Sequence, residues 1–300
     1  MNHGLLYAAL AFTLWGVAPL YFKQLSAVSP VEIVMHRSVW SLVFLLAVLA
    51  LARRWAWLGP ALRQPRQVAL FAFSALLLSG NWTLYVWAVN NGRVLDASLG
   101  YFINPLVNVM LGVLVLHERL RRWQWAALAL AAAGVLWLTW QAGHLPWIAL
   151  TLAATFGLYG LLRKTAALGA LEGLAMETLL MALVALPLLA LWTLQGRSAV
   201  SHADGSLLAW LMLAGPVTAV PLLLFAAAAR RVTLATMGLM QYIGPTIGFG
   251  LGVWLFHEPF DGQRLVGFVL IWSALVVYSA EGWWQSRQRA AVPAAEAAAG

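Results

Sequence analysis

The chain has 300 residues, of which 63% are hydrophobic and 9% are charged, with a net charge of +8 at pH 7. Soluble globular chains carry about 25% charged residues, so this composition and the mean hydropathy of +0.82 exclude a soluble protein and indicate one that crosses a membrane several times. The chain has no cysteine, which excludes disulfides, thiolate metal sites and a cysteine nucleophile.

Apolar runs between charged residues and Pro or Gly breaks predict ten membrane spans, because a transmembrane helix needs about 20 mostly apolar residues. In chain order the spans are Gly4–Phe22, Val31–Ala52, Val68–Val89, Ala97–Leu116, Trp123–Trp140, Pro146–Leu162, Leu171–Leu194, Ser206–Ala229, Leu234–Phe256 and Leu265–Gly282. No soluble domain fits between them. The fold class is therefore an all-α membrane protein.

The placement of Lys and Arg predicts the orientation, because cytoplasmic loops carry an excess of both. With the N-terminus in the cytoplasm, 13 of these residues fall in cytoplasmic loops and 4 in external loops, and Arg37 lies within a span. Both termini are thus expected in the cytoplasm. The net positive charge indicates topology rather than a nucleic-acid surface, so we expect a lipid bilayer and no nucleic acid as a partner.

An internal repeat appears when the chain is shifted by 140 residues. Eight of the twenty positions from 99 to 118 are then identical with positions 239 to 258, and Pro105 aligns with Pro245. Each half holds five spans, and because five is odd the second half enters the membrane from the opposite side. We expect two inverted repeats, at residues 1–145 and 146–285, and a disordered cytoplasmic tail at 286–300. Many secondary transporters have this architecture and bind substrate between the halves.

Several stretches resemble the bacterial RarD proteins of the EamA branch of the drug/metabolite transporter superfamily. They are Glu32–Trp40, Gly80–Trp82, Trp87–Asn91, Ala97–Asn108 and Gln241–Thr246. The resemblance runs from about Leu5 to Gly282 and implies the fold of two inverted five-helix repeats in the bacterial inner membrane. RarD-type proteins are described as chloramphenicol-sensitivity or permease proteins, and relatives in the superfamily export amino acids and other metabolites, including aromatic ones.

The sharpest signals among the ionisable side chains within the predicted spans are His36, Arg37 and Glu177. Such a group costs about 3 kcal/mol on insertion scales unless it faces a cavity or a partner. In one interpretation Arg37 binds a substrate carboxylate, while Glu177 binds an amine or takes up a proton. His36, which aligns with Glu177 under a shift of 141, is the second candidate for proton coupling. In the other interpretation Arg37 and Glu177 pair and lock the halves together.

Further polar and aromatic residues are candidates for substrate binding. Tyr101, Asn104 and Asn108 follow spacings of three and four, which put them on one helix face. Asn amides in a membrane line polar cavities or bond neighbouring helices, so tight packing is the alternative interpretation. The other candidates are Trp40, Asn81, Tyr85, Tyr159, Gln241 and Tyr242.

Paired prolines and glycines predict a gate. Pro105 and Pro245 lie mid-span at matching positions, where proline removes a helix hydrogen bond and kinks the helix. Gly244 and Gly248 match Asn104 and Asn108, and glycines four residues apart permit close helix approach. We expect the fourth and ninth spans to face each other, with the Asn side chains above a glycine face.

The pairs His117-Glu118 and His257-Glu258 end the fourth and ninth spans. Inverted repeats would place them on opposite membrane faces, so we expect no shared metal site, and instead salt bridges to Arg119 or Arg264. We expect no cofactor either.

These features predict a secondary transporter, a permease or exporter, rather than an enzyme. It would move small metabolites such as amino acids, related amphipathic compounds or drugs by alternating access, driven by a substrate gradient or by protons. No nucleotide-binding loop is present, which argues against a primary pump. The alternatives are an intramembrane enzyme acting on a lipid-like substrate, for which the ten acidic residues are too scattered to hold a metal, and a passive channel.

Overall fold

The computed structural model describes residues 3–91, 93–143, 146–202, 204–255 and 262–299, and within these ranges the chain forms helices and no strands. The long helices are α1 (His3–Phe22), α2 (Pro30–Leu51), α4 (Pro65–Asn90), α5 (Val94–Leu114), α6 (Arg122–Ala142), α7 (Trp147–Thr165), α8 (Ala170–Leu194), α9 (Gly205–Ala229) and α12 (Gly262–Ala299). The shorter ones are η1 (Lys23–Leu25), α3 (Leu58–Leu62), η2 (Ala199–His202), α10 (Leu234–Met240), α11 (Ile243–Gly250) and the π-helical segment η3 (Leu251–Leu255).

Each predicted span overlaps a helical part of the described chain, and Phe256 at the end of the ninth lies outside the described residues. Among the described residues, seven helices are long and apolar enough to cross a membrane, and α5 has a shorter apolar stretch, Leu99–Leu114. The ninth span is not one helix but the succession of α10, α11 and η3. The last helix, α12, continues to Ala299 and so includes the segment for which the sequence predicts a disordered tail. Alanine has the highest helix propensity of all residues, which favours helix in this Ala-rich segment.

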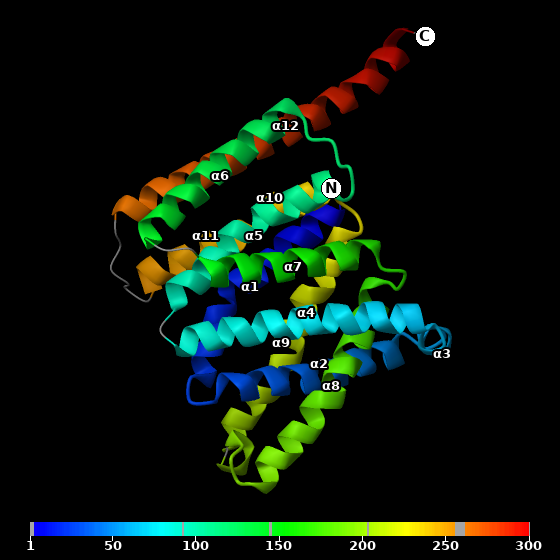
Figure 1. Cartoon of the computed structure of the whole chain (residues 1–300). Coiled ribbons are helices and arrows are strands. Elements are labelled where there is room, and N and C mark those ends of the chain that lie inside the picture. Colours follow the sequence, from blue (N-terminus) through cyan, green and yellow to red (C-terminus); the bar gives the residue numbers. More distant parts are fainter. Residues whose placement is uncertain (1–2, 92, 144–145, 203, 256–261, 300) are drawn as a thin grey trace.

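The helices pack in a pattern that repeats between the halves. The pairs α2 with α8, α5 with α10 and α6 with α12 each join one helix of the first half to its counterpart in the second, and Figure 1 shows α6 and α12 side by side at one edge. The other contacts come as corresponding pairs. Thus α1 packs on α9 as α7 packs on α4, and α5 packs on α7 as α1 packs on α11. Two repeats related by a pseudo-two-fold axis produce this pattern.

Glycines allow the paired helices to approach closely. A Cβ atom at Gly238 of α10 would lie 2.5 Å from the Pro105 carbonyl oxygen of α5, and one at Gly134 of α6 would lie 2.7 Å from the Gly267 carbonyl oxygen of α12. Gly215 of α9 lies equally close to the Trp40 backbone of α2. In a bilayer the lipid tails are as apolar as the side chains, so there is no hydrophobic force between helices. Close packing at small residues such as these drives helix association instead.

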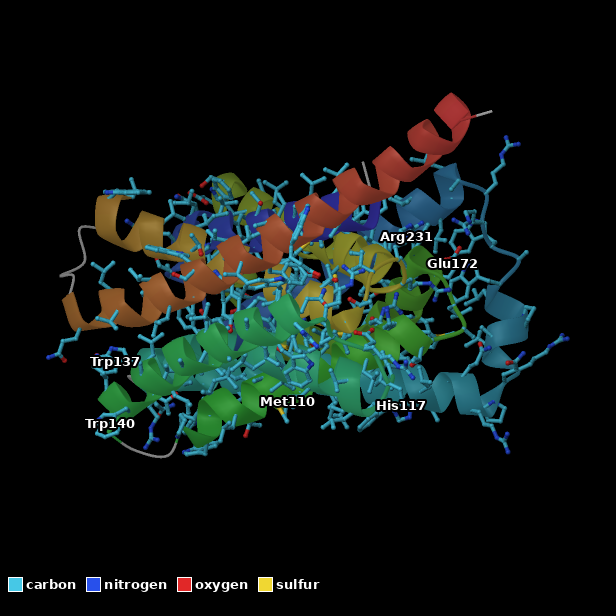
Figure 2. All side chains as sticks on the ribbon, turned by 90° about the horizontal axis from the view of Figure 1, so that it is seen from above. Met110, His117, Trp137, Trp140, Glu172 and Arg231 are labelled. Atoms are coloured by element: carbon cyan, nitrogen blue, oxygen red, sulfur yellow. The ribbon has the colours of Figure 1, made fainter. Side chains whose placement is uncertain are left out.

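The surface has an apolar belt between two ends of different character. Leu136, Leu183 and Val276 are each more than 60% exposed, as lipid-facing side chains of a membrane helix are. Figure 2 shows Glu172, His117 and Arg231 at one end of the bundle, and Trp137 and Trp140 at the other. Charged and tryptophan side chains at the ends of apolar helices are typical of the interfaces of a bilayer. We call the end with Glu172, His117 and Arg231 the charged end.

Candidate functional site

Glu177 of α8 is completely buried and holds together three helices. Its Oε1 atom accepts a hydrogen bond of 2.5 Å from the Ser74 hydroxyl of α4, and its Oε2 atom accepts one of 3.4 Å from the Tyr159 hydroxyl of α7. The Arg163 guanidinium of α7 lies 3.6 Å from Oε1. A charge in such a place persists only when it is paired and hydrogen-bonded, and Glu177 has both kinds of partner.

Arg163 is the main functional candidate that the sequence analysis missed. The count of loop charges places it among the cytoplasmic cations, yet α7 continues to Thr165 and leaves Arg163 only 1% exposed. Its Nη2 atom also donates to the carbonyl oxygens of Gly169 and Ala170. Arg163 follows Tyr159 by four residues and therefore shares its helix face. That spacing is the signal by which the sequence could have revealed it.

Arg37 of α2 is buried, with 2% of its surface exposed, but it does not pair with Glu177. Its guanidinium carbon lies 4.5 Å from the centre of the Trp82 ring of α4, a cation–π contact. No carboxylate of the described residues lies within ion-pair distance of it. The salt bridge between Arg37 and Glu177 that would lock the halves is therefore absent from this part of the chain, because Arg163 takes that place.

Arg37 lies close enough to Tyr159 for an electrostatic interaction, and the Tyr159 hydroxyl donates to Glu177. Tyr159 is fully buried, and its ring stacks on Phe225 of α9 at a centroid distance of 6.0 Å. Arg37 is thus a neighbour of the buried group of Tyr159, Glu177 and Arg163, and we call these four residues the polar path. It joins residues of both halves in the interior of the bundle.

A string of aromatic rings extends from Arg37 in the other direction. The Phe22 ring lies 6.0 Å from that of Trp82, the Trp82 ring 6.1 Å from that of Tyr85, and the Tyr85 ring 5.8 Å from that of Tyr101. These contacts are edge-on or tilted, as aromatic pairs prefer. Of the residues predicted from the sequence, Tyr85 thus lies beside Trp82, the aromatic partner of Arg37, and Tyr101 lies beside Tyr85.

The polar face of α5 meets α10, as the sequence predicts. The Asn108 amide donates a hydrogen bond of 2.8 Å to the Gln241 side chain, and both residues are buried. The Tyr242 hydroxyl donates to the Phe102 carbonyl oxygen at 3.1 Å. Asn104 is also buried, and its Oδ1 atom has no partner among the described residues.

The predicted glycine face differs from the structure. Asn108 packs near Gly157 and Gly160 of α7 instead, where an added Cβ would lie 3.6 Å and 3.5 Å from its Oδ1 atom. A Cβ at Gly244 would meet only the Phe12 backbone oxygen, at 3.4 Å, and one at Gly248 would meet nothing within 4 Å. The break after α10 separates these glycines from the contact with α5.

The two prolines of the predicted gate occupy different local structures. Pro105 lies inside the continuous helix α5, whereas Pro245 is the third residue of α11, directly after the break at Gln241 and Tyr242. The first turn of a helix tolerates proline because its N–H groups have no intrahelical partner. The ninth span is therefore broken where the fourth is a continuous helix.

The remaining predicted residues lie outside the polar path. The Asn81 amide donates to the Leu152 carbonyl oxygen and the Thr155 hydroxyl of α7, both at 2.8 Å. His36 lies 3.8 Å from Glu32, whose carboxylate accepts hydrogen bonds from loop residues before α9. The indole N–H of Trp40 is buried without a partner among the described residues. The structure thus brings together only part of the predicted set.

Glu118 makes the densest set of contacts at the charged end. Its carboxylate accepts hydrogen bonds of 2.7 and 3.0 Å from the backbone N–H groups of Leu234 and Ala235, the first residues of α10. Lys164 lies 3.7 Å from it, in place of the predicted Arg119. His257 and Glu258 lie outside the described residues. Among the described residues no group of three or more His, Asp or Glu side chains has the arrangement of a metal site.

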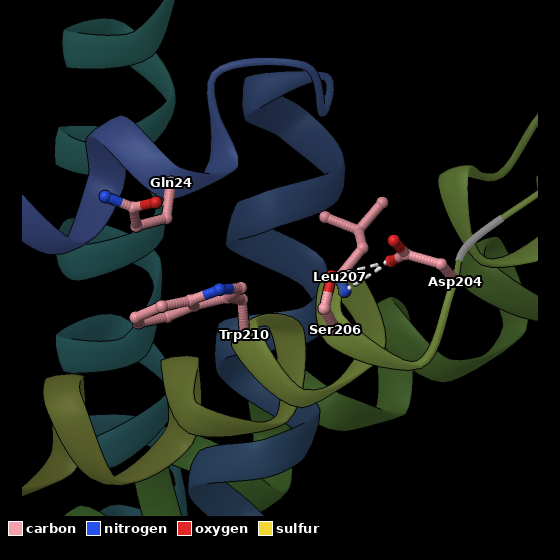
Figure 3. A pocket seen from close by; sticks show the side chains of 5 residues that line it. All are labelled: Gln24, Asp204, Ser206, Leu207 and Trp210. Carbon is pink, nitrogen blue, oxygen red and sulfur yellow. Dashed lines mark hydrogen bonds between the residues drawn. The ribbon is translucent and has the colours of Figure 1, made fainter.

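Neither of two hollows on the described surface is lined by the predicted site residues. One, of about 460 Å³, is lined by Gln24, Asp204, Ser206, Leu207 and Trp210 (Figure 3). There Asp204 caps α9 by accepting a hydrogen bond from the Leu207 N–H, and this bond lowers the pKa of Asp204. The other lies on the apolar outer face of α12. The first hollow therefore lies at the capped start of α9, and the second belongs to the lipid-facing surface, so neither indicates a substrate site.

Comparisons with known proteins agree on one family. The model of the EamA-like transporter family matches residues 2–140. The chain is 49% identical to the Protein RarD of Streptomyces exfoliatus, covering 91% of this chain and 87% of that one, and 44% identical to the Protein RarD of Escherichia coli, covering 96% and 97%. It is 46% identical to an uncharacterized transporter of Vibrio cholerae, over 93% and 92%. A solved structure described only as a crystal structure of a protein has a TM-score of 0.70 at 21% identity, covering 91% of this chain and 96% of its own, and so shares the fold.

Proposed function

Since the chain belongs to the EamA-like transporter family, within its RarD group, it is a multi-pass transporter of the bacterial inner membrane, and we propose that it is a secondary transporter that works by alternating access. It moves a small metabolite, such as an amino acid, a related amphipathic compound or a drug. Both termini lie in the cytoplasm, and the charged end faces that side. A substrate gradient or a proton gradient drives the movement.

The pairing of helices between the halves carries this proposal. The contacts of α2 with α8 and of α5 with α10 join the halves, and buried polar groups lie on all four of these helices or directly at their ends. In inverted-repeat transporters the substrate binds at the repeat interface, near the bilayer midplane and beside interrupted helices. The break between α10 and α11 supplies such an interruption next to Gln241. Rocking one half against the other would expose these groups to each side in turn.

Counterflow separates this proposal from the channel and enzyme alternatives. We expect a labelled solute, chosen by a thermal-shift screen of amino acids, nucleosides and amphenicol drugs, to enter proteoliposomes with saturable kinetics. Unlabelled solute inside should accelerate that entry severalfold, because the loaded carrier reorients in both directions. Protein-free liposomes are the control. Uptake that rises linearly with concentration and ignores the internal solute would indicate a channel, and turnover of liposome lipid without transport would indicate an enzyme.

Glu177 is the proposed proton carrier, because its carboxylate is completely buried between α4, α7 and α8. Glu177→Gln keeps the size, and its amide can accept from the Ser74 hydroxyl and donate to the Tyr159 hydroxyl, but it cannot titrate. We therefore expect the variant to transport at a rate that no longer changes with pH across the range in which the wild type changes. Glu172→Gln is the matched control, since Glu172 pairs with the exposed Arg54 at the charged end. If Glu177→Gln keeps the pH profile of the wild type, Glu177 is not the proton carrier.

A further inference from the structure

The substrate class follows from an imbalance of charge around Arg37. Its Nε and Nη1 atoms are buried and have no hydrogen-bond partner among the described residues. Buried donors are nearly always satisfied in native structures, and an intramembrane ionisable residue marks a functional site by default. Arg37 thus offers two nitrogen donors and one positive charge for which the described protein supplies no anion.

The neighbouring carboxylates are already committed to other partners. Both oxygens of Glu177 are engaged, by Ser74 and Arg163 on one side and by Tyr159 on the other. Glu32, the buried acid on the same helix as Arg37, accepts hydrogen bonds of 2.5 and 2.7 Å at its Oε1 atom from the Ser198 hydroxyl and the Ala199 N–H. Both carboxylates thus already have partners within the protein, whereas Arg37 has no carboxylate partner among the described residues, and these surroundings of Arg37 favour an anion.

The aromatic string supplies an apolar surface beside this charge. Tyr101 at its far end is 45% exposed, although Asn104 and Asn108 on the same helix face are buried. Tyr101 lies nine residues from Met110, which at about 100° per residue puts it on the opposite side of α5. Met110 is 54% exposed on the outer surface of the bundle (Figure 2). Tyr101 therefore lies on the side of α5 opposite this outer surface, the side that also carries the buried Asn104 and Asn108.

We propose that Arg37, with the rings of Trp82, Tyr85 and Tyr101, binds an amphipathic carboxylate that has a planar apolar part and no amine. The inference rests on the proposed transport function and names its substrate class. A guanidinium presents its N–H groups in a planar fork that matches the two oxygens of a carboxylate. The apolar part of the ligand packs against the rings of α4 and α5. An amine on the ligand would be repelled by the positive charge of Arg37, which has no carboxylate partner among the described residues.

Three ligands that share one ring test the proposal, namely phenylacetate, phenylalanine and phenethylamine. They carry a carboxylate, both charges and an amine respectively. We expect isothermal titration of the purified full-length protein to rank phenylacetate at least tenfold tighter than phenylalanine, with no measurable binding of phenethylamine. Equal affinities for the first two, or tighter binding of phenylalanine, would overturn the proposed substrate class.

Variants at Arg37 locate the binding. Arg37→Gln should weaken phenylacetate at least tenfold, and Arg37→Lys should weaken it less, because lysine keeps the charge and loses the planar fork. The matched control is Arg197→Gln, since Arg197 is exposed and stacks on Trp192, away from the proposed site. If Arg37→Gln fails to fold, the Arg37→Lys variant still tests whether Arg37 binds the carboxylate, and the ligand ranking of the wild type still tests the substrate class. Unchanged affinity in a folded Arg37 variant would refute the site.

Failure of this inference is distinguishable from failure of the transport function. Counterflow of any other solute, combined with no binding of phenylacetate, would refute the carboxylate class and leave the transporter intact. Binding of phenylacetate at Arg37 without counterflow would support the site and contradict transport.

Discussion

Replacing Arg163 with methionine is expected to lower the free energy of unfolding by about 3–5 kcal/mol, because removal of one member of a buried pair leaves the other charge uncompensated. The Arg163 and Glu177 side chains are 1% and 0% exposed, so water cannot take the place of the missing partner. The variant also loses the hydrogen bonds to the carbonyl oxygens of Gly169 and Ala170, which join the end of α7 to the start of α8.

The combined variant Arg163→Met/Glu177→Gln should recover about 2 kcal/mol of that loss, because it leaves no unpaired charge in the interior. The neutral amide introduced by Glu177→Gln would still accept the hydrogen bond of Ser74. Unfolding of the detergent-purified variants by heat or by a denaturing detergent measures the four corners of this cycle. Arg197→Met, at the exposed arginine, is the control and should change stability little. Losses that add without recovery would show that Arg163 and Glu177 are not energetically coupled.

Most of the fold could be predicted from the sequence, because a segment that crosses lipid must be a long apolar helix. In this sequence such segments are recognisable as apolar runs between charged residues. The break in the ninth span could not be predicted in this way. The same alignment that matched Pro105 with Pro245 concealed their difference, which lies in the neighbours. Asn104 stands before Pro105, whereas Gly244 stands before Pro245. Glycine is a poor helix former, and α11 begins afresh with Pro245 in its first turn.

The site was harder to predict, because burial of a charged side chain at a helix end depends on which way it points. Arg163 and Lys164 are adjacent in sequence and both basic, yet Arg163 is 1% exposed beside Glu177 and Lys164 is 21% exposed beside Glu118. A count of loop charges treats them alike. Charge neutrality alone pairs Arg37 with Glu177, but only the packing of α7 against α4 and the contacts of α8 show that Arg163 is the partner. The sequence thus indicated that charged residues lie in the membrane interior, but only the structure showed which arginine pairs with Glu177.

Removal of the Glu118 carboxylate should open the charged end of the bundle. Glu118 follows α5 in the first half, and its oxygens hold the first N–H groups of α10 in the second. Lys164 at the end of α7 lies beside the same carboxylate. It donates hydrogen bonds to the Ala229 and Val232 carbonyl oxygens, at 3.1 and 2.5 Å, and so joins the end of α7 to the segment before α10. One side chain thus connects three segments of both halves. We expect this contact to form when the charged end is closed and to break when it opens.

The expected effect on that equilibrium is large. A hydrogen bond to a charged acceptor contributes about 1.5–3 kcal/mol, and Glu118 accepts two of them from a helix N-terminus, whose dipole also favours an anion. Even one such contribution corresponds to a change of more than tenfold in the ratio of closed to open molecules. Glu118→Ala should therefore shift the population toward the form that is open at the charged end.

A single cysteine reports the opening directly, because the chain has none of its own. Ala235 is 2% exposed at the start of α10, and Ala235→Cys keeps the backbone N–H that Glu118 binds. In inverted membrane vesicles, a membrane-impermeant maleimide should label the cysteine at this position more than tenfold faster when Glu118→Ala is added. Glu172→Ala is the matched control, because its partner Arg54 is exposed and the pair lies at the same end. Equal labelling rates with and without Glu118 would mean that the carboxylate merely caps α10, whereas acceleration confined to Glu118→Ala would identify it as the contact that closes this side during transport.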